Sequence, residues 1–208
     1  MKSWFFFMVC LIFAVHATAA QPWRFEGRGV EAYATFNHSF GCVSNSAEIA
    51  IGKFRVVDGP GKPGRLVDSI IYIDSIDVCT NKPVLTAFGF PSFSAAEFRI
   101  GSSLKFAALN ASTSLSDANS TRSVPIVIQL TWVGVKGQKT RSAFRSHSIN
   151  PGLTTKFTDI GVSNPATVKG FISLGGSNLF PSAADSGSLV RSTSTQFLIF
   201  KNALPRLP

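Results

Sequence analysis

The segment Val124-Pro-Ile-Val-Ile-Gln-Leu-Thr-Trp-Val-Gly134 decides the fold class of this chain. Every second position carries a β-branched, aliphatic or aromatic residue, and the positions between them carry a mixed set. Alternation with a period of two predicts a β-strand that has one face in a core. The residues expected in the core are Val124, Ile126, Ile128, Leu130 and Trp132.

The stretch that follows this strand is basic on one side. After a turn at residues 134–137, basic residues alternate with mostly small polar residues. We therefore expect residues 136–148 to return as the second strand of a hairpin with a basic outer surface. The residues on the basic side are Lys139, Arg141, Arg145 and His147.

Residues 1–20 have the pattern of a secretory signal peptide. Lys2 supplies a positive start, an apolar run covers residues 4–15, and small residues at 17–20 offer a cleavage site. The apolar run is too short to span a bilayer comfortably, and a short membrane anchor is the alternative. We therefore expect a secreted protein, extracellular or periplasmic, from which this segment is removed.

The remaining residues predict a single all-β domain. Without residues 1–20, whose only charge is Lys2, the chain has 19 Lys and Arg against 11 Asp and Glu. Turn signals separate about nine or ten short strands, and neither an amphipathic helix pattern nor a membrane-spanning apolar run occurs among them. We expect an antiparallel β-sandwich, jelly-roll-like or Ig-like, over residues 21–202 and a flexible tail at 203–208.

The same patterns assign several local elements. Residues 21–31 are expected to be a leader before the first strand, and the small, polar residues 110–123 a mobile loop. Residues 98–108 are expected to form one strand, and residues 154–162 and 167–174 a pair of strands.

Two cysteines remain after residue 20, Cys42 and Cys79. In an oxidising compartment a lone pair of cysteines forms a disulfide, which here would enclose 36 residues. The chain-entropy estimate for such a loop is about 4 kcal/mol, as an upper figure. A reactive thiol or half of a metal site is the alternative, and no CxxC spacing supports it.

A set of strand and turn patterns resembles an uncharacterised group of small secreted bacterial all-β proteins that has no assigned activity. The patterns lie within residues 84–175 and are Phe88-Gly-Phe-Pro91 with Glu97-Phe98, Leu130-Thr-Trp-Val-Gly134 and residues 141–148. The resemblance implies a secreted all-β protein. It transfers no functional residue.

The sequence indicates neither a catalytic nor a metal-binding site. After residue 20 the histidines are His38 and His147, and no GxSxG serine motif accompanies them. Asp68, Asp74 and Asp77 do not have the spacing of a calcium-binding loop and are expected at turns and strand ends. We therefore expect a non-enzymatic protein without a cofactor. A hydrolase that places one histidine beside a serine and a carboxylate is the least favoured alternative.

The basic segment is the one local anomaly in the sequence, because six Lys and Arg residues and no acid lie between Asp117 and Asp159. A positive face attracts anionic partners, so we expect it to contact an anionic glycan or a cell-surface component. The alternative is a solvated strand that keeps the edge of the sheet soluble. Sequence-specific nucleic-acid binding is not expected, because few aromatic residues interleave with the basic ones to stack on bases.

A carbohydrate-binding module is the alternative function. Such a module presents aromatic platforms on an outer sheet face. The candidates are Trp23, Tyr33 and Tyr72, since Trp132 is expected in the core.

Overall fold

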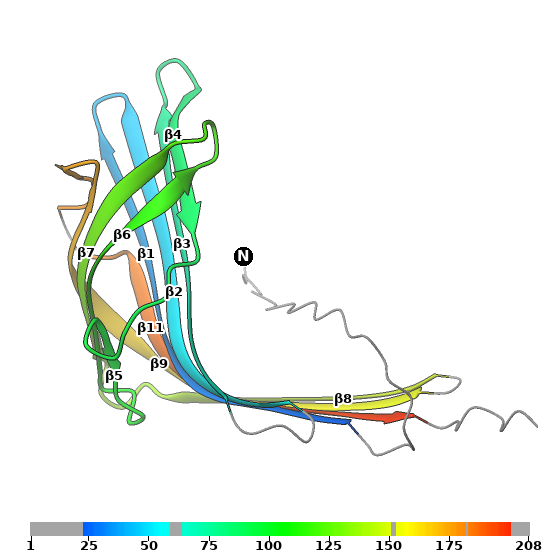
Figure 1. The fold of residues 1–208 in the computed structure, drawn as a ribbon. Coiled ribbons are helices and arrows are strands. Elements are labelled where there is room, and N and C mark those ends of the chain that lie inside the picture. The colour runs from blue at the N-terminus through cyan, green and yellow to red at the C-terminus, as the bar shows by residue number, and fades with distance from the viewer. Residues whose placement is uncertain (1–22, 59–63, 151–152, 182, 201–208) are drawn as a thin grey trace, which may run out of the picture.

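All regular elements in the described part of the chain are β-strands (Figure 1). The computed structural model describes residues 23–58, 64–150, 153–181 and 183–200, and it contains no helix within these ranges. The prediction of an all-β chain is therefore confirmed. In chain order the strands are β1 (Trp23–Phe40), β2 (Val43–Asp58), β3 (Gly64–Asp77), β4 (Lys82–Gly89), β5 (Phe98–Ile100), β6 (Phe106–Asp117), β7 (Ser123–Gly134), β8 (Thr140–Asn150), β9 (Leu153–Leu174), β10 (Ser177–Asn178) and β11 (Ser186–Phe200).

The strands form one antiparallel sheet, and a path of eight strands within it closes on itself. The path runs through β9, β11, β1, β2, β3, β4, β6 and β7, and β7 then pairs with β9 to complete it. β5 pairs with β6, while β8 and β10 pair with β9. Because every pairing among the described residues belongs to one sheet, the two packed sheets of a sandwich are not confirmed.

The closed part of the sheet, here called the body, encloses the hydrophobic core. Successive side chains of a strand point to opposite faces, so alternate residues of β7 point inward. Ile126, Ile128, Leu130 and Trp132 are buried there, as predicted. The indole N–H of the fully buried Trp132 donates a hydrogen bond of 2.9 Å to the carbonyl oxygen of Tyr33, which satisfies its polar group inside the core.

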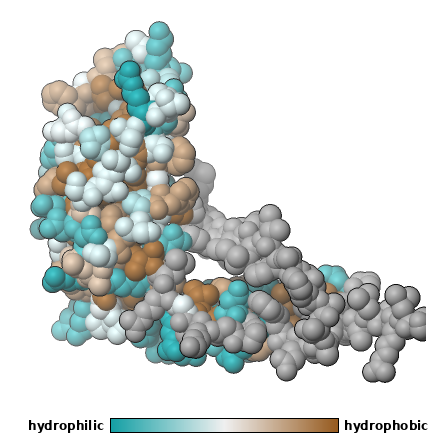
Figure 2. Space-filling view, viewed as in Figure 1, coloured by the Kyte–Doolittle hydropathy of each residue, from teal (hydrophilic) through white to brown (hydrophobic). Residues whose placement is uncertain are grey.

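Five strands, β9, β11, β1, β2 and β3, continue beyond the body and form with β8 a flat extension, here called the arm. The arm consists of β8 with residues 153–163 of β9, 190–200 of β11, 23–30 of β1, 53–58 of β2 and 64–67 of β3. In Figure 1 these strands bend away from the body and run to the right as a sheet seen from its edge. Hydrophilic residues line its lower side in Figure 2, whereas the body shows a mixture of both kinds.

The predicted hairpin between residues 124–134 and the basic segment is wrong. Both β7 and β8 pair with β9, one after the other: residues 166–174 of β9 pair with β7 and residues 153–163 with β8. At 22 residues, β9 is long enough for two partners. It also runs through the positions that were expected to divide it into two strands. Pro165 lies between the two partners, where a residue without an N–H is tolerated.

Three further local predictions are wrong. The described part of the expected leader is the start of β1, because residues 23–35 pair with β11. Most of the expected loop at residues 110–123 is strand β6, in which Ala111 and Leu115 alternate into the core. The expected strand at residues 98–108 is divided into β5 and the start of β6 by a turn at Leu104, whose φ is 56°.

Cys42 and Cys79 form the predicted disulfide, with their Cα atoms 5.3 Å apart. It joins the turn after β1 to the turn after β3. The predicted signal peptide at residues 1–20 and the tail at 203–208 lie outside the described residues. None of the described residues belongs to a helix that could cross a membrane.

Candidate functional site

The inward-facing side of the body continues onto the arm, where we call it the inner face. In β2, Ile49 and Ile51 lie in the core, and the next two residues on the same side are Lys53 and Arg55. β1, β9 and β11 also pass from the core to the arm without a break in their registers. The same side of the sheet is therefore apolar where the sheet is closed and basic where it opens to solvent.

The two faces of the arm carry opposite charges. The strand registers place every described Lys, Arg and His side chain of the arm on the inner face, and Glu26 is the only carboxylate among the described residues there. The acidic residues of the arm and its base lie on the outer face: Glu31, Asp58, Asp68 and Asp159. The basic residues of the inner face are Arg24, Arg28, Lys53, Arg55, Arg141, Arg145, His147, Lys156 and Arg191.

Glu26 is already engaged by two arginines of its own strand. Its Oε2 atom lies 2.5 Å from Nη2 of Arg24, and its Oε1 atom lies 2.5 Å from Nε of Arg28. Arg24 also lies over the ring of Phe197, 5.6 Å from its centroid. These are the ion pairs formed among the described residues, so Lys53, Arg55 and Arg191 have no carboxylate partner there.

Arginines occupy directly opposite positions on neighbouring strands at the base of the arm. Arg28 of β1 is directly opposite Arg55 of β2, and Arg65 of β3 follows Arg55 in the same row of the register. The side chain of Arg65 lies outside what the structure describes. Side chains directly opposite in an antiparallel pair have Cβ atoms about 5 Å apart, and like charges at this spacing are destabilising. This row therefore concentrates positive charge at a cost to the free protein.

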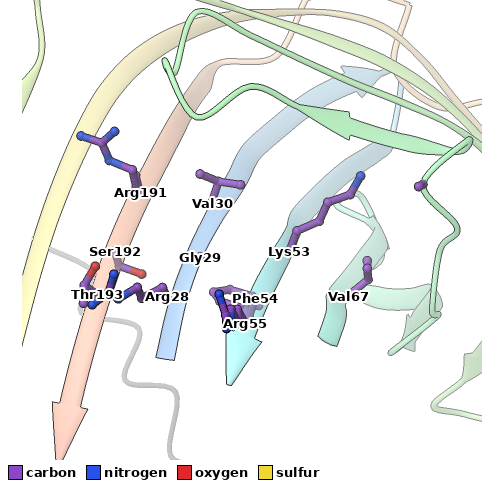
Figure 3. A pocket seen from close by; sticks show the side chains of 11 residues that line it. Arg28, Gly29, Val30, Lys53, Phe54, Arg55, Val67, Arg191, Ser192 and Thr193 are labelled. Carbon is purple, nitrogen blue, oxygen red and sulfur yellow. The ribbon is translucent and has the colours of Figure 1, made fainter. Parts of the chain in front are cut away.

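A pocket of ≈ 660 Å³ lies along this row (Figure 3). Its walls come from four neighbouring strands, β11, β1, β2 and β3, and from Ala95 in the segment before β5. Four cationic side chains line it, together with the aliphatic side chains of Val30 and Val67. The four cations are Arg28, Lys53, Arg55 and Arg191.

Cations at the base of the arm also contact the segment around β5, which closes this end of the body. The ammonium of Lys53 lies 5.4 Å from the centroid of the Phe98 ring, and Figure 3 shows this side chain pointing toward β5. Arg191 donates a hydrogen bond of 3.4 Å to the carbonyl oxygen of Ser102, and Lys139 one of 2.8 Å to that of Ser103. The pocket is therefore covered on one side by protein.

The structure places the four basic residues named from the sequence along the edge of the arm. Arg141, Arg145 and His147 project from β8, an exposed strand, onto the inner face. Lys139 precedes β8 and reaches the body through Ser103. A smaller hollow of ≈ 290 Å³ is lined by Arg145, Ser146, His147, Lys156, Phe157 and Thr158.

The basic residues of β1, β2 and β11 also belong to the inner face, although the sequence did not predict them there. The alternation in the sequence does indicate the residues of β1, because Arg24, Glu26 and Arg28 occupy the same alternate positions as the buried Ala32 and Ala34. The expectation of a leader at residues 21–31 separates these three residues from the first strand, whereas they are its first part. Lys53 and Arg55 share one side of β2, but only the pairings of the closed sheet connect that side with β8.

The aromatic candidates are divided between the core and the surface. Trp132 is buried, and the side chain of Trp23 lies outside the described part of the structure. Tyr72 is 40% exposed and pairs across strands with Phe88, which is also 40% exposed. Partial burial, with smaller effects from Asp74 and Glu48, raises the pKa of the Tyr72 hydroxyl.

The histidines and aspartates named from the sequence do not form one site. His38 pairs with Asn45 near the disulfide end of the body, whereas His147 is in the arm. Asp74 accepts a hydrogen bond of 2.7 Å from the hydroxyl of Thr86. Asp77 accepts hydrogen bonds from the backbone N–H groups of Cys79 and Thr80. These bonds, above all the one from Thr80, lower the pKa of the Asp77 carboxyl.

No protein-family model matches the chain, and no curated protein matches it. Among solved structures it is similar to a protein described as AttH from Nitrosomonas europaea, with 10% identity and a TM-score of 0.26 over 88% of this chain and 53% of that one. The chain thus spans about half the length of that protein. It is also similar to the enduracididine biosynthesis enzyme MppR, with 10% identity and a TM-score of 0.23 over 90% and 89% of the two chains. Similarities this low carry no argument about the present chain.

Proposed function

We propose that this protein is a secreted, non-enzymatic binding protein that holds an anionic glycan, or another anionic polymer of a cell surface, on the inner face of its arm. The observation that carries the proposal is the separation of charge between the two faces of the arm. A concentrated positive face attracts polyanions and speeds their association. The disulfide supports an oxidising compartment, where such polymers occur.

Protection of a sheet edge does not account for this face. Lysine and arginine on an edge strand prevent strand-to-strand aggregation, and Arg141 and Arg145 of β8 could serve that purpose. Arg28, Arg55 and Arg191, however, lie on strands that are paired on both sides. Interior strands have no free edge to protect, so their positive charge favours a bound partner.

The dimensions of the arm suit an extended ligand. At about 3.3 Å per residue, a strand of β8's 11 residues spans roughly 36 Å. Cations are spread along this length, from Arg191 at the base to His147 and Lys156 towards the far end. A linear polyanion can therefore contact several cations at once, with the release of bound counterions.

Retention on a heparin column, with heparin as the polyanion probe, tests this proposal. We expect the Arg141→Glu/Arg145→Glu variant to elute at clearly lower salt than the wild type, because two contacts become repulsive. The matched control is Arg122→Glu/Lys169→Glu, which has the same change in net charge on exposed residues outside the arm. This control should elute close to the wild type. Equal elution of the two variants would show that net charge alone determines retention and would refute the proposal.

Binding of a neutral sugar at Tyr72 and Phe88 is a second candidate function. These two partly exposed rings are direct cross-strand neighbours on the outer side of β3 and β4. Glu48 is opposite Tyr72 on β2, and Asp74 lies two residues further along the same side, so carboxylate oxygens flank the rings. Aromatic faces beside hydrogen-bonding groups are a common arrangement for sugar rings.

The salt dependence of binding separates this candidate from the first. A neutral glycan held on Tyr72 and Phe88 should bind equally at low and physiological salt, and Tyr72→Ala should abolish the binding. The Arg141→Glu/Arg145→Glu variant should leave it unchanged. A glycan array in which no neutral sugar binds the wild-type protein would eliminate this second candidate.

A further inference from the structure

Among the described residues, the pocket at the base of the arm carries more positive charge than nearby carboxylates neutralise. Arg28, Lys53, Arg55 and Arg191 line it, and Glu26, the one carboxylate that the described residues place on the inner face, is shared between Arg24 and Arg28. The remaining cations face a concave volume. A multiply charged anion complements this arrangement better than a single carboxylate does.

The register makes Arg28 and Arg55 a pair that a ligand can bridge. They are direct cross-strand partners, so their side chains start about 5 Å apart on the same face. Each guanidinium presents a planar set of N–H donors that matches the oxygens of phosphate or carboxylate. A tetrahedral dianion between them would accept hydrogen bonds from both and remove their mutual repulsion.

The surroundings of the pocket favour an ester over a free inorganic ion. The volume of ≈ 660 Å³ is in the range of sites for small organic ligands, which is about 300–1,000 Å³, and exceeds the needs of one phosphate ion. Val30, Val67 and Ala95 add apolar surface beside the cations. The cover provided by the segment around β5 reduces the exposure of bound charge to water, which strengthens charge–charge interactions.

We infer that this pocket binds a phosphate or sulfate ester. Arg28 and Arg55 would bind its oxyanion, and Lys53 and Arg191 would add positive charge around it. The inference rests on the proposed function, because the ester would be a charged group of the anionic ligand held by the arm. The proposed function names only an anionic polymer on the inner face, whereas the pocket gives one location and one class of ligand group, a phosphate or sulfate ester. The ester can belong to a soluble molecule or to a lipid headgroup, since both offer the same oxyanion.

Calorimetric titration at low ionic strength tests the inference with glucose 6-phosphate, and with glucose as its uncharged counterpart. We expect glucose 6-phosphate to bind, glucose not to bind, and Arg55→Gln to weaken binding by about tenfold or more, the usual effect of removing a charge-assisted hydrogen bond. Arg122→Gln, which removes the same charge from an exposed position outside the arm, should change the affinity by less than about twofold. Equal weakening by the two substitutions, or none by Arg55→Gln, would overturn the inference.

Vesicles distinguish the two sources of the ester. Phosphatidylcholine vesicles with added phosphatidic acid are compared with phosphatidylcholine alone, again with wild type and Arg55→Gln. Binding that requires phosphatidic acid and is weakened by Arg55→Gln, without binding of glucose 6-phosphate, would support the site with a lipid source. If neither probe binds to the wild type, the site is refuted.

Thermal stability gives an independent readout that also reports folding. Without ligand, Arg55→Gln should melt at the same temperature as the wild type or higher, because the substitution removes a like charge from the position directly opposite Arg28. Glucose 6-phosphate should raise the melting temperature of the wild type more than that of the variant. Retention of the wild type on heparin without any ester binding would refute the pocket alone, whereas ester binding without specific retention would refute the polymer-binding function.

Discussion

At the scale of single residues, the same sequence pattern has two consequences in this protein. Alternate positions of β1 and β2 are apolar in the body and charged in the arm, although the direction of the side chains is unchanged. The difference is the environment: in the body an opposite wall excludes water, and in the arm the described residues provide none. Hydrophobic burial therefore stabilises the first set of positions, and solvation allows charge at the second.

Glu31 is a carboxylate placed where burial opposes its charge. Burial, followed by the nearby Asp68, raises the pKa of its side chain above the usual 4.5. A raised carboxyl pKa in the folded state means that stability falls as pH rises from the unfolded-state pKa towards the folded-state pKa. Above the folded-state pKa of Glu31 the protein carries this destabilisation in full.

The substitution Glu31→Gln should remove this effect. We expect the variant to have a higher melting temperature than the wild type at pH 7. The difference in melting temperature should be smaller, or zero, below pH ~4, where the Glu31 carboxyl is protonated in both the folded and the unfolded state. Thermal melts of both proteins across this range check it, and the relevant quantity is the difference between them, since other carboxyls titrate in both. A difference that does not change with pH would refute the assignment.

At the scale of elements, β9 organises the sheet because it pairs with β7, β8, β10 and β11. Its contact with β7 depends on Gly170, which has a φ of 142°. A Cβ atom there would lie 1.8 Å from the carbonyl oxygen of Gln129, which is backbone of β7 and cannot move without breaking the pairing. Closure of the body therefore depends on this glycine.

Gly170→Ala should lower the free energy of unfolding by about 2–4 kcal/mol, because it adds both backbone strain and a steric clash. The matched control is Gly27→Ala in β1, where an added Cβ would meet only the Phe25 ring, at 3.6 Å. This control should change the stability by less than about 1 kcal/mol. Urea denaturation of both variants measures the difference, and similar losses would contradict the role given to Gly170.

The disulfide links two turns of the sheet, the one between β1 and β2 and the one between β3 and β4. Replacing both cysteines by serine should reduce the free energy of unfolding by up to about 4 kcal/mol, mainly through the greater freedom of the unfolded chain. Urea denaturation under non-reducing conditions compares the variant with the wild type. Adding a reductant should bring the wild type to the level of the variant, and an unaffected wild type would contradict a stabilising role.

At the scale of the whole molecule, the sequence predicted what depends on local pattern. The alternation in residues 124–134 identified β7 and its buried side, and the count and spacing of cysteines identified the disulfide. Strand partners depend on chain length and closure, which alternation does not encode. For this reason β8 was assigned to β7, and the continuity of β9 through Pro165 was missed.

The candidate site was likewise predicted only where its residues are close together in the sequence. Four of its basic residues were found because Lys139, Arg141, Arg145 and His147 are close in sequence. The arginine row at the base of the arm joins β1 and β2 to a surface that also includes β8, β9 and β11. Only the register brings these segments onto one face, so the charge separation is a property of the assembled sheet.

The most direct test of the central claim is arginine footprinting by mass spectrometry. The wild-type protein is labelled with phenylglyoxal in the presence and absence of heparin, at physiological salt. Binding on the inner face should protect Arg24, Arg28, Arg55, Arg141, Arg145 and Arg191, while the exposed Arg99 and Arg122 of the body remain reactive. Protection of Arg99 and Arg122 to the same extent, or no protection of the arginines in the arm, would contradict the assignment of the arm as the binding surface.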